Sequence, residues 1–157
     1  MKNKTNAMRR LDSAKIPYEV FEYEVDENDL SGVHIARDIG LDPDIVFKTL
    51  VAKGDKTGFM VFCIPCAMEL DLKKCARASG DKKIEMLHVK DLLSVTGYIR
   101  GGCSPIGMKK AFPTFIDETA ILWDKITVSA GVKGCQLMLS PEKLISLVKA
   151  TVCDLTA

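Results

Sequence analysis

IVFKTLVA, residues 45–52, is the stretch that decides the fold. Its nearly continuous run of apolar and β-branched side chains is typical of a strand buried on both faces. Side chains alternate along a strand, so Lys48 shares a face with Val46 and Leu50, while Thr49 lies on the other face. A lysine is almost never fully buried unless it is paired. Lys48 therefore either reaches water from near the end of the strand or binds an anionic ligand.

Patterns on both sides of this strand predict an alternation of helices and short strands. The residues GDKTG at 54–58 predict a hairpin that leads into a second strand over 59–65. A hairpin pairs its strands antiparallel, so the sheet is expected to be mixed. Helices are expected over 5–15, 31–39, 70–79, 89–96 and 141–150, and strands over 18–25, 84–87, 114–116, 126–129, 135–139 and 151–154. The pattern predicts one α/β domain over residues 1–157.

Composition narrows the class of protein. The 157 residues fit one domain, and a hydrophobic fraction of 47% is enough for a sizeable core. A net charge of +1 argues against a protein that coats nucleic acid, which would be strongly basic. No run reaches the roughly 18 apolar residues that cross a bilayer, and the first six residues do not lead into the apolar core of a signal peptide. A cytoplasmic protein without a membrane segment is expected.

Six cysteines occur, and Cys63 and Cys66 form a C-x-x-C motif. Such a pair could be redox-active or could supply half of a zinc site. A zinc site needs two further ligands at a recognisable spacing, but there is no second C-x-x-C, and the two histidines, His34 and His88, are isolated. Cys63 also lies inside the apolar run FMVFCI at 59–64. The cysteines are therefore interpreted as reduced thiols with a mainly structural role, and neither a metal nor a cofactor is expected.

Two glycine-rich segments are the other candidates for a site. GGCSPIG at 101–107 has little side-chain cover, so a ligand could approach its main chain, and its N–H groups could bind an anion or an oxyanion. SAGVKG at 129–134 places a hydroxyl beside a glycine turn. Most Gly/Pro clusters such as 101–107 are ordinary surface turns, and taken alone the segment 129–134 favours a plain hairpin. Neither matches a phosphate-binding P-loop or a dinucleotide fingerprint, and the sequence contains no G-x-S-x-G elbow or credible triad. A hydrolase of this sequence would depend on backbone oxyanion stabilisation and substrate positioning.

Five short motifs, taken in order, identify a family resemblance. From about residue 8 to the C-terminus the chain resembles the YbaK/EbsC family of Cys-tRNA(Pro) deacylases, which are similar to the editing domain of bacterial prolyl-tRNA synthetases. The motifs are VFKTL at 46–50, LDLKK at 70–74, TGY at 96–98, GGCSPIG at 101–107 and SAGVKG at 129–134. The resemblance implies a curved, barrel-like mixed sheet flanked by helices. It also implies hydrolysis, without a metal, of the ester between a mischarged amino acid and the tRNA 3′ end.

The resemblance also implies roles for individual residues. The matching lysine, Lys48, is expected to engage the terminal nucleotide through its phosphate, and Gly102 is expected to offer backbone contacts to the reacting carbonyl. The chemistry is expected to be substrate-assisted, through hydroxyl groups of the terminal ribose or the thiol of the esterified cysteine. Prolyl-tRNA synthetase is the expected protein partner. The residues expected to bind the substrate are Tyr23, Thr49, Gly101, Cys103, Ser104, Pro105, Ser129, Gly131 and Gln136.

Two departures from the family pattern lie near the expected amino-acid pocket. Gln136 stands where the better-known bacterial deacylases carry an acid, and the segment 26–32 is shorter and lacks the family's phenylalanine. The choice of amino acid is therefore where this chain is expected to differ. The alternative to an enzyme is a binding module that holds a nucleotide or a tRNA 3′ end in the same pocket without catalysis. A weaker alternative is a thiol protein that uses Cys63 and Cys66.

Overall fold

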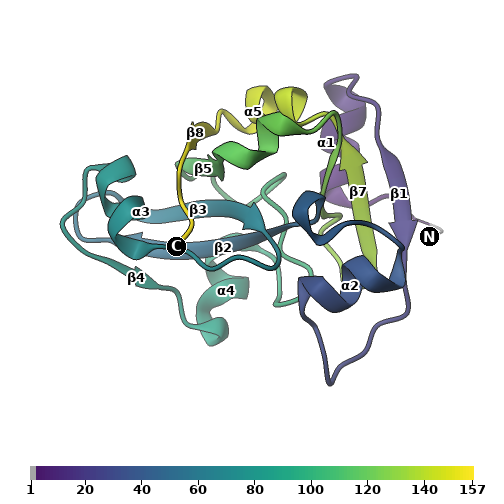
Figure 1. The fold of residues 1–157 in the computed structure, drawn as a ribbon, viewed down its shortest axis with the longest axis horizontal. Coiled ribbons are helices and arrows are strands. Elements are labelled where there is room, and N and C mark those ends of the chain that lie inside the picture. Colours follow the sequence, from purple (N-terminus) through teal and green to yellow (C-terminus); the bar gives the residue numbers. More distant parts are fainter. Residues whose placement is uncertain (1–2) are drawn as a thin grey trace.

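The computed structural model describes residues 3–157, which form two β-sheets around a shared core (Figure 1). The larger sheet has five strands in the order β4-β2-β3-β5-β8, and the smaller sheet has three in the order β1-β7-β6. The strands are β1 (Glu19–Glu22), β2 (Phe47–Gly54), β3 (Gly58–Pro65), β4 (Ile84–Met86), β5 (Thr114–Asp117), β6 (Ile126–Ser129), β7 (Cys135–Leu139) and β8 (Thr151–Cys153).

The predicted hairpin at 54–58 is confirmed and organises the larger sheet. β2 and β3 pair antiparallel along their whole length, from Phe47 opposite Pro65 to Gly54 opposite Gly58. β3 then pairs in parallel with β5, and β5 in parallel with β8. The sheet is therefore mixed, as the sequence predicts.

Helices form where their caps and periodicity predict them. Each begins after a residue with extended backbone, as at Thr5, whose hydroxyl accepts the N–H of Met8 at 3.2 Å. The helices are α1 (Asn6–Ser13), α2 (Gly32–Asp38), α3 (Leu72–Ser79), α4 (Val89–Thr96) and α5 (Pro141–Val148), with 3₁₀ turns η1 (Pro43–Ile45) and η2 (Glu118–Leu122). The second 3₁₀ turn has no counterpart in the sequence prediction. Among residues 3–157, no helix combines the length and apolar character needed to cross a bilayer.

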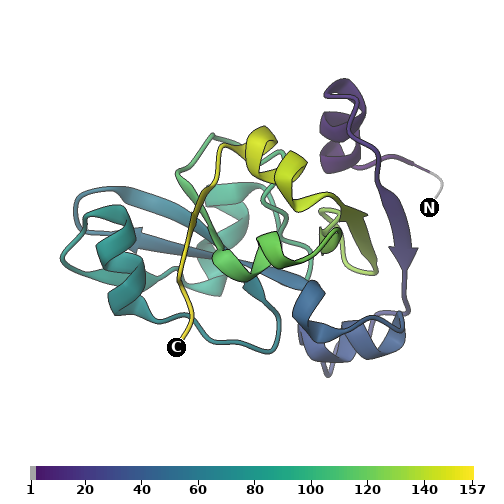
Figure 2. The ribbon, with the colours of Figure 1, turned by 45° about the horizontal axis from the view of Figure 1, so that its top comes forward.

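The two faces of the larger sheet are covered by different elements. On one face, Cys75 and Ala76 of α3 pack against Met60 and Phe62 of β3. On the other face lies the main core, in which residues of β3 and β5 pack against the smaller sheet, α1 and α5. Its fully buried large side chains include Leu11, Phe47, Ile106, Ile116, Ile126, Leu137, Leu139 and Leu144. Figures 1 and 2 both place α1 at the end of the molecule away from the β2–β3 turn.

The expected curved, barrel-like sheet is only partly found. There is no closed barrel in the described part of the chain, because the two sheets meet through one parallel bridge, between Val46 and Thr127. Figure 1 shows the reason: β7 and β1 run across the direction of β2 and β3 rather than along it. Strands that cross cannot continue a hydrogen-bonded ladder, so the contact ends after one bridge.

This crossing leaves part of one edge of β2 without a strand partner. β6 reaches that edge at Val46, and β4 pairs with it only from Ala52 to Gly54. Between them, no strand of residues 3–157 covers Phe47–Leu50. The N–H of Leu87 donates to the Val51 carbonyl at 3.0 Å, so Val51 directs its backbone to this edge. Because these directions alternate along a strand, Thr49 does the same.

Candidate active site

A pocket of about 380 Å³ lies at this open edge of β2. Residues 46–51 form its floor, and its walls come from the 30–32 segment and α2, from β4 and α4, from the glycine-rich loop, and from β6 and β7. Several residues expected from the sequence meet here, namely Lys48, Thr49, Gly101, Cys103, Ser129 and Gln136. The others, Tyr23, Gly102, Ser104, Pro105 and Gly131, do not line this pocket.

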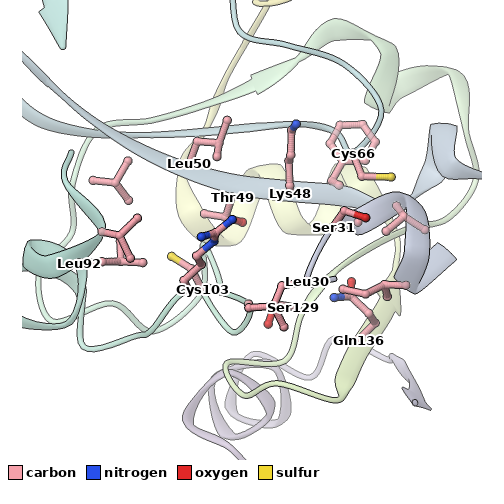
Figure 3. Close-up of a pocket in the computed structure, with 18 of the residues that line it drawn as sticks. Leu30, Ser31, Lys48, Thr49, Leu50, Cys66, Leu92, Cys103, Ser129 and Gln136 are labelled. Carbon is pink, nitrogen blue, oxygen red and sulfur yellow. The ribbon is translucent and has the colours of Figure 1, made fainter. Parts of the chain in front are cut away.

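Lys48 is half-buried and has no partner for its charge among residues 3–157. Figure 3 shows its side chain leaving β2 on the side of Leu50 and Cys66, opposite to Thr49. The positive charge acts on Cys66, where it partly opposes the rise in the pKa of that thiol that burial causes. A half-buried cation without a carboxylate partner is suited to binding an anion, the second of the two interpretations that the sequence left open.

The glycine-rich loop approaches the pocket in a conformation that only glycines permit. The N–H of Gly102 donates to the carbonyl of Ile99 at 3.0 Å, and Gly101 has a φ of +86°. A Cβ on Gly102 would lie 3.0 Å from the backbone nitrogen of Lys133, so the loop and the 131–134 turn touch through their main chains. The Gly102 N–H is therefore already engaged within the loop.

Ser104 and Pro105 are buried parts of the loop, and Ser104 helps to hold it in place. Ser104 is fully buried, and its hydroxyl accepts the N–H of Ile106 at 3.2 Å. The hydroxyl of Tyr98 donates to the carbonyl of Ile106. These two hydrogen bonds hold the backbone of the loop at Ile106, and in this arrangement Ser104 has a structural role.

Ser129 and Gln136 are opposite each other on β6 and β7 and place polar groups in the pocket. The Ser129 hydroxyl accepts the N–H of Gly131 at 3.2 Å. The side-chain carbonyl of Gln136 accepts the hydroxyl of Thr127 at 3.1 Å, which leaves its amide N–H groups as donors. Burial raises the pKa of the Tyr23 phenol, and hydrogen bonds from Gly134 and Gln136 partly oppose that rise.

The charge in the pocket is entirely positive. Among residues 3–157, the side chains that line it include Lys48 and Arg100 but no aspartate, glutamate or histidine. Sequence reasoning missed Arg100, although its position directly before the two glycines of the loop was the available signal. A pocket with two cations, apolar walls and a few hydrogen-bonding groups fits an anionic ligand that also has an uncharged part.

Three comparisons with known proteins were informative about the family of this chain. A family model described as "Aminoacyl-tRNA editing domain" matches residues 31–147, which is most of the chain. This protein belongs to the aminoacyl-tRNA editing domain family. The resemblance found in the motifs is thereby confirmed, together with the general class of enzyme, an aminoacyl-tRNA hydrolase.

Individual relatives of this editing domain agree. "Putative Cys-tRNA(Pro)/Cys-tRNA(Cys) deacylase EbsC" of Enterococcus faecalis is 52% identical over 153 residues, which are 98% of this chain and 93% of that protein. A crystal structure described as "a putative trans-editing enzyme for prolyl tRNA synthetase" has a TM-score of 0.83 at 23% identity and covers 99% of both chains. The crystal structure of hypothetical protein APE2540 has a TM-score of 0.88 at 17% identity, over 98% of this chain and 100% of that one. The two structures support the fold alone.

The two positions at which the sequence is expected to depart from the family pattern lie at this pocket of the editing domain. Leu30, from the segment 26–32, and Gln136 both line the pocket. Gln136 is buried, and its side chain is an uncharged amide. Both residues therefore contribute to the shape and polarity of the pocket.

The surroundings of the cysteines in this editing domain disfavour their reactive thiolate form. All six thiols are free, and Cys63 and Cys66 form no disulfide. Burial raises the pKa of Cys63 and of Cys103 to about 12. Both side chains are therefore protonated at neutral pH, and a thiol is a poor nucleophile. This environment does not favour the thiol-protein interpretation.

Proposed function

We propose that this protein is a trans-acting editing enzyme that hydrolyses the ester bond of mischarged tRNA, with Cys-tRNA(Pro) as its substrate. The family and the printed name of the 52% identical relative support this proposal. The observation that carries it is the pocket at the open edge of β2. Lys48 provides an unpaired cation on one side of the strand, and Ser129 and Gln136 provide hydrogen-bonding groups in the same pocket.

An aminoacylated tRNA end has the matching chemistry. Its terminal nucleotide carries a phosphate, which suits Lys48. Its ester carries a small amino acid, which suits the part of the pocket bounded by Leu30, Ser129 and Gln136. The proposed backbone donor to the ester carbonyl is the Thr49 N–H, whose direction toward the open edge supports this role. Gly102 contributes by allowing the loop to pack closely against the 131–134 turn.

The catalytic base is proposed to come from the substrate. The pocket side chains of residues 3–157 include no carboxylate or imidazole, and the Cys103 thiol stays protonated at neutral pH. A hydroxyl of the terminal ribose can position and activate water for attack on the ester. Alternatively, the thiol of the esterified cysteine can attack its own carbonyl and release the tRNA, with water then opening the ring that forms. The enzyme supplies positioning and stabilises the oxyanion.

Prolyl-tRNA synthetase is the proposed partner. A net charge of +1 gives the domain little general attraction for a tRNA body, whose binding depends on phosphate contacts. A synthetase that already holds tRNA(Pro) would supply that contact and release the mischarged end to this pocket. Deacylation is expected to be faster when the synthetase is present at limiting tRNA concentration.

The test of this function is the release of amino acid from Cys-tRNA(Pro) and Ala-tRNA(Pro), measured with and without the synthetase. Release of cysteine alone would favour attack by the substrate thiol, and release of both amino acids would favour the ribose hydroxyl. Correctly charged Pro-tRNA(Pro) is the control and should remain intact. Binding of the charged tRNA without release of any amino acid would contradict the enzyme and identify a tRNA-end binding module instead.

Replacing Cys103 by alanine is expected to leave deacylation largely intact. A thiol with a pKa of about 12 carries no charge at neutral pH, so its loss should change kcat/KM by less than about threefold. The profile of rate against pH from about 7 to 9 should keep its shape, since Cys103 does not titrate in that range. A loss of activity of about a hundredfold in a variant with unchanged Tm would show that the thiol takes part in the chemistry.

A further inference from the structure

The glycine-rich loop fixes an arginine at the pocket. Residues 99–102 form a β-turn, closed by the hydrogen bond of 3.0 Å from the Gly102 N–H to the Ile99 carbonyl. Gly101, the third residue of the turn, has a φ of +86°, which is the type II pattern. Arg100 is the second residue of the turn, and it is exposed while lining the pocket. The turn therefore determines where its side chain leaves the backbone.

Arg100 is also available to bind a ligand. Its guanidinium makes no hydrogen bond or ion pair with residues 3–157, and in this it resembles Lys48. Neighbouring lysines differ. Lys133, which would contact a Cβ on Gly101, is paired with Glu27 at 3.0 Å. Lys109 donates to the carbonyl of Ser94 at 3.3 Å.

The two free cations lie on different sides of β2. Cys103 packs against Val51, which shares the Thr49 face of the strand, so the loop that carries Arg100 lies on that face. Lys48 leaves the strand on the opposite side (Figure 3). A ligand with one phosphate can satisfy one of these cations. A single-stranded nucleic acid carries a phosphate at every nucleotide and can satisfy both.

The adjacent pocket gives a useful contrast. It has a volume of about 360 Å³ and is lined by residues of β2, β3, β4 and α4, where Lys53 is accompanied by Glu85 and Asp91. Those carboxylates would repel a phosphate. The pocket at the β2 edge has no carboxylate among its lining residues within 3–157, so the path of an anionic strand leads along Lys48 and Arg100.

We propose that Arg100 binds a second phosphate of the tRNA 3′ end, next to the one bound by Lys48. The two residues would then hold two phosphates of the single-stranded terminus across the edge of β2, and this double contact would set the direction in which the aminoacyl group enters. The inference rests on the proposed function, because it takes the tRNA end as the ligand. Arg100 is a binding residue in this scheme and contributes to substrate affinity rather than to the chemical step.

The test compares wild type with Arg100→Gln and Arg100→Lys, and with Lys90→Gln, an exposed lysine of α4 outside the pocket lining. The slope of log(kcat/KM) against log salt is measured over about 50 to 300 mM KCl, because each phosphate contact on a single strand contributes roughly 0.7 to that slope. Arg100→Gln should reduce the slope by about 0.7 and raise KM about tenfold with little change in kcat. Arg100→Lys should keep the slope, and Lys90→Gln should match wild type.

Filter binding of uncharged tRNA(Pro) by the same proteins separates this inference from the proposed function. A reduced salt slope for Arg100→Gln in binding supports the phosphate contact, even if wild type releases no amino acid and the enzyme proposal fails. A slope equal to that of wild type in the binding assay overturns the inference, whether or not deacylation is observed. A loss of slope in Lys90→Gln equal to that in Arg100→Gln overturns it too, since the effect would then follow from overall charge.

Discussion

Replacing Lys48 by methionine is expected to reduce kcat/KM for deacylation by about a hundredfold, or roughly 2.7 kcal/mol of transition-state stabilisation. Methionine has a similar length and fills the same space, but it removes the charge that we propose binds the terminal phosphate. Because Lys48 has no charged partner among residues 3–157, the folded protein loses no ion pair. The Tm should therefore be unchanged or slightly higher, as often happens when a functional charge is removed from a partly buried site.

The matched control is Lys53→Met on the same strand. Lys53 is exposed, its ammonium lies 5.3 Å from the centre of the Phe59 ring, and it does not line the pocket at the β2 edge. This variant should deacylate tRNA at the wild-type rate. Full activity of Lys48→Met would remove Lys48 from the mechanism, and equal losses in both variants would point to a general effect of charge on tRNA binding.

Replacing Gly102 by alanine is expected to have the next largest effect. The new methyl group would lie 3.0 Å from the nitrogen of Lys133 and from the carbonyl carbon of Val132, and backbone atoms cannot rotate away. The loop and the 131–134 turn must separate, which should cost about 1–3 kcal/mol in the free energy of unfolding. The same movement displaces Gly101, Cys103 and the neighbourhood of Ser129, and a shift of about 1 Å at such a site can lower the rate about a hundredfold.

Gly80→Ala is the control that separates the two effects. Gly80 ends α3 with a φ of +82°, and a Cβ there would meet nothing within 4 Å. The substitution should lower the free energy of unfolding by about 1 kcal/mol through backbone strain and leave deacylation unchanged. Chemical denaturation and deacylation kinetics measured on both variants decide the question. Wild-type activity in Gly102→Ala would show that the close approach is unimportant for the site.

Much of the fold could be predicted from the sequence because its signals are local. The hairpin at 54–58, the helix after Ser140-Pro141 and the strand around Lys48 each depend on a few neighbouring residues. The separation into two sheets could not be predicted, because it depends on the angle at which β6 and β7 cross β2. No short stretch of sequence encodes that angle.

The candidate site could be predicted in part for the same reason. Lys48 is conspicuous in an apolar strand, and the glycines of the loop mark a close approach of the main chain. The sequence could not show that the Gly102 N–H donates to the Ile99 carbonyl, or that Arg100 is the second residue of that β-turn. Both facts depend on the type of the turn, and a pair of glycines is compatible with several turn types.

The uncovered stretch of β2 also bears on how the protein avoids self-association. A bare strand edge can recruit a strand from another molecule, and natural proteins commonly interrupt such edges with lysine or keep them short. Here β6 and β4 limit the bare stretch to Phe47–Leu50, and Lys48 lies inside it. The 30–32 segment and α4 also form walls beside this stretch. A short bare stretch that contains a lysine is thus a poor template for pairing with a strand of another molecule.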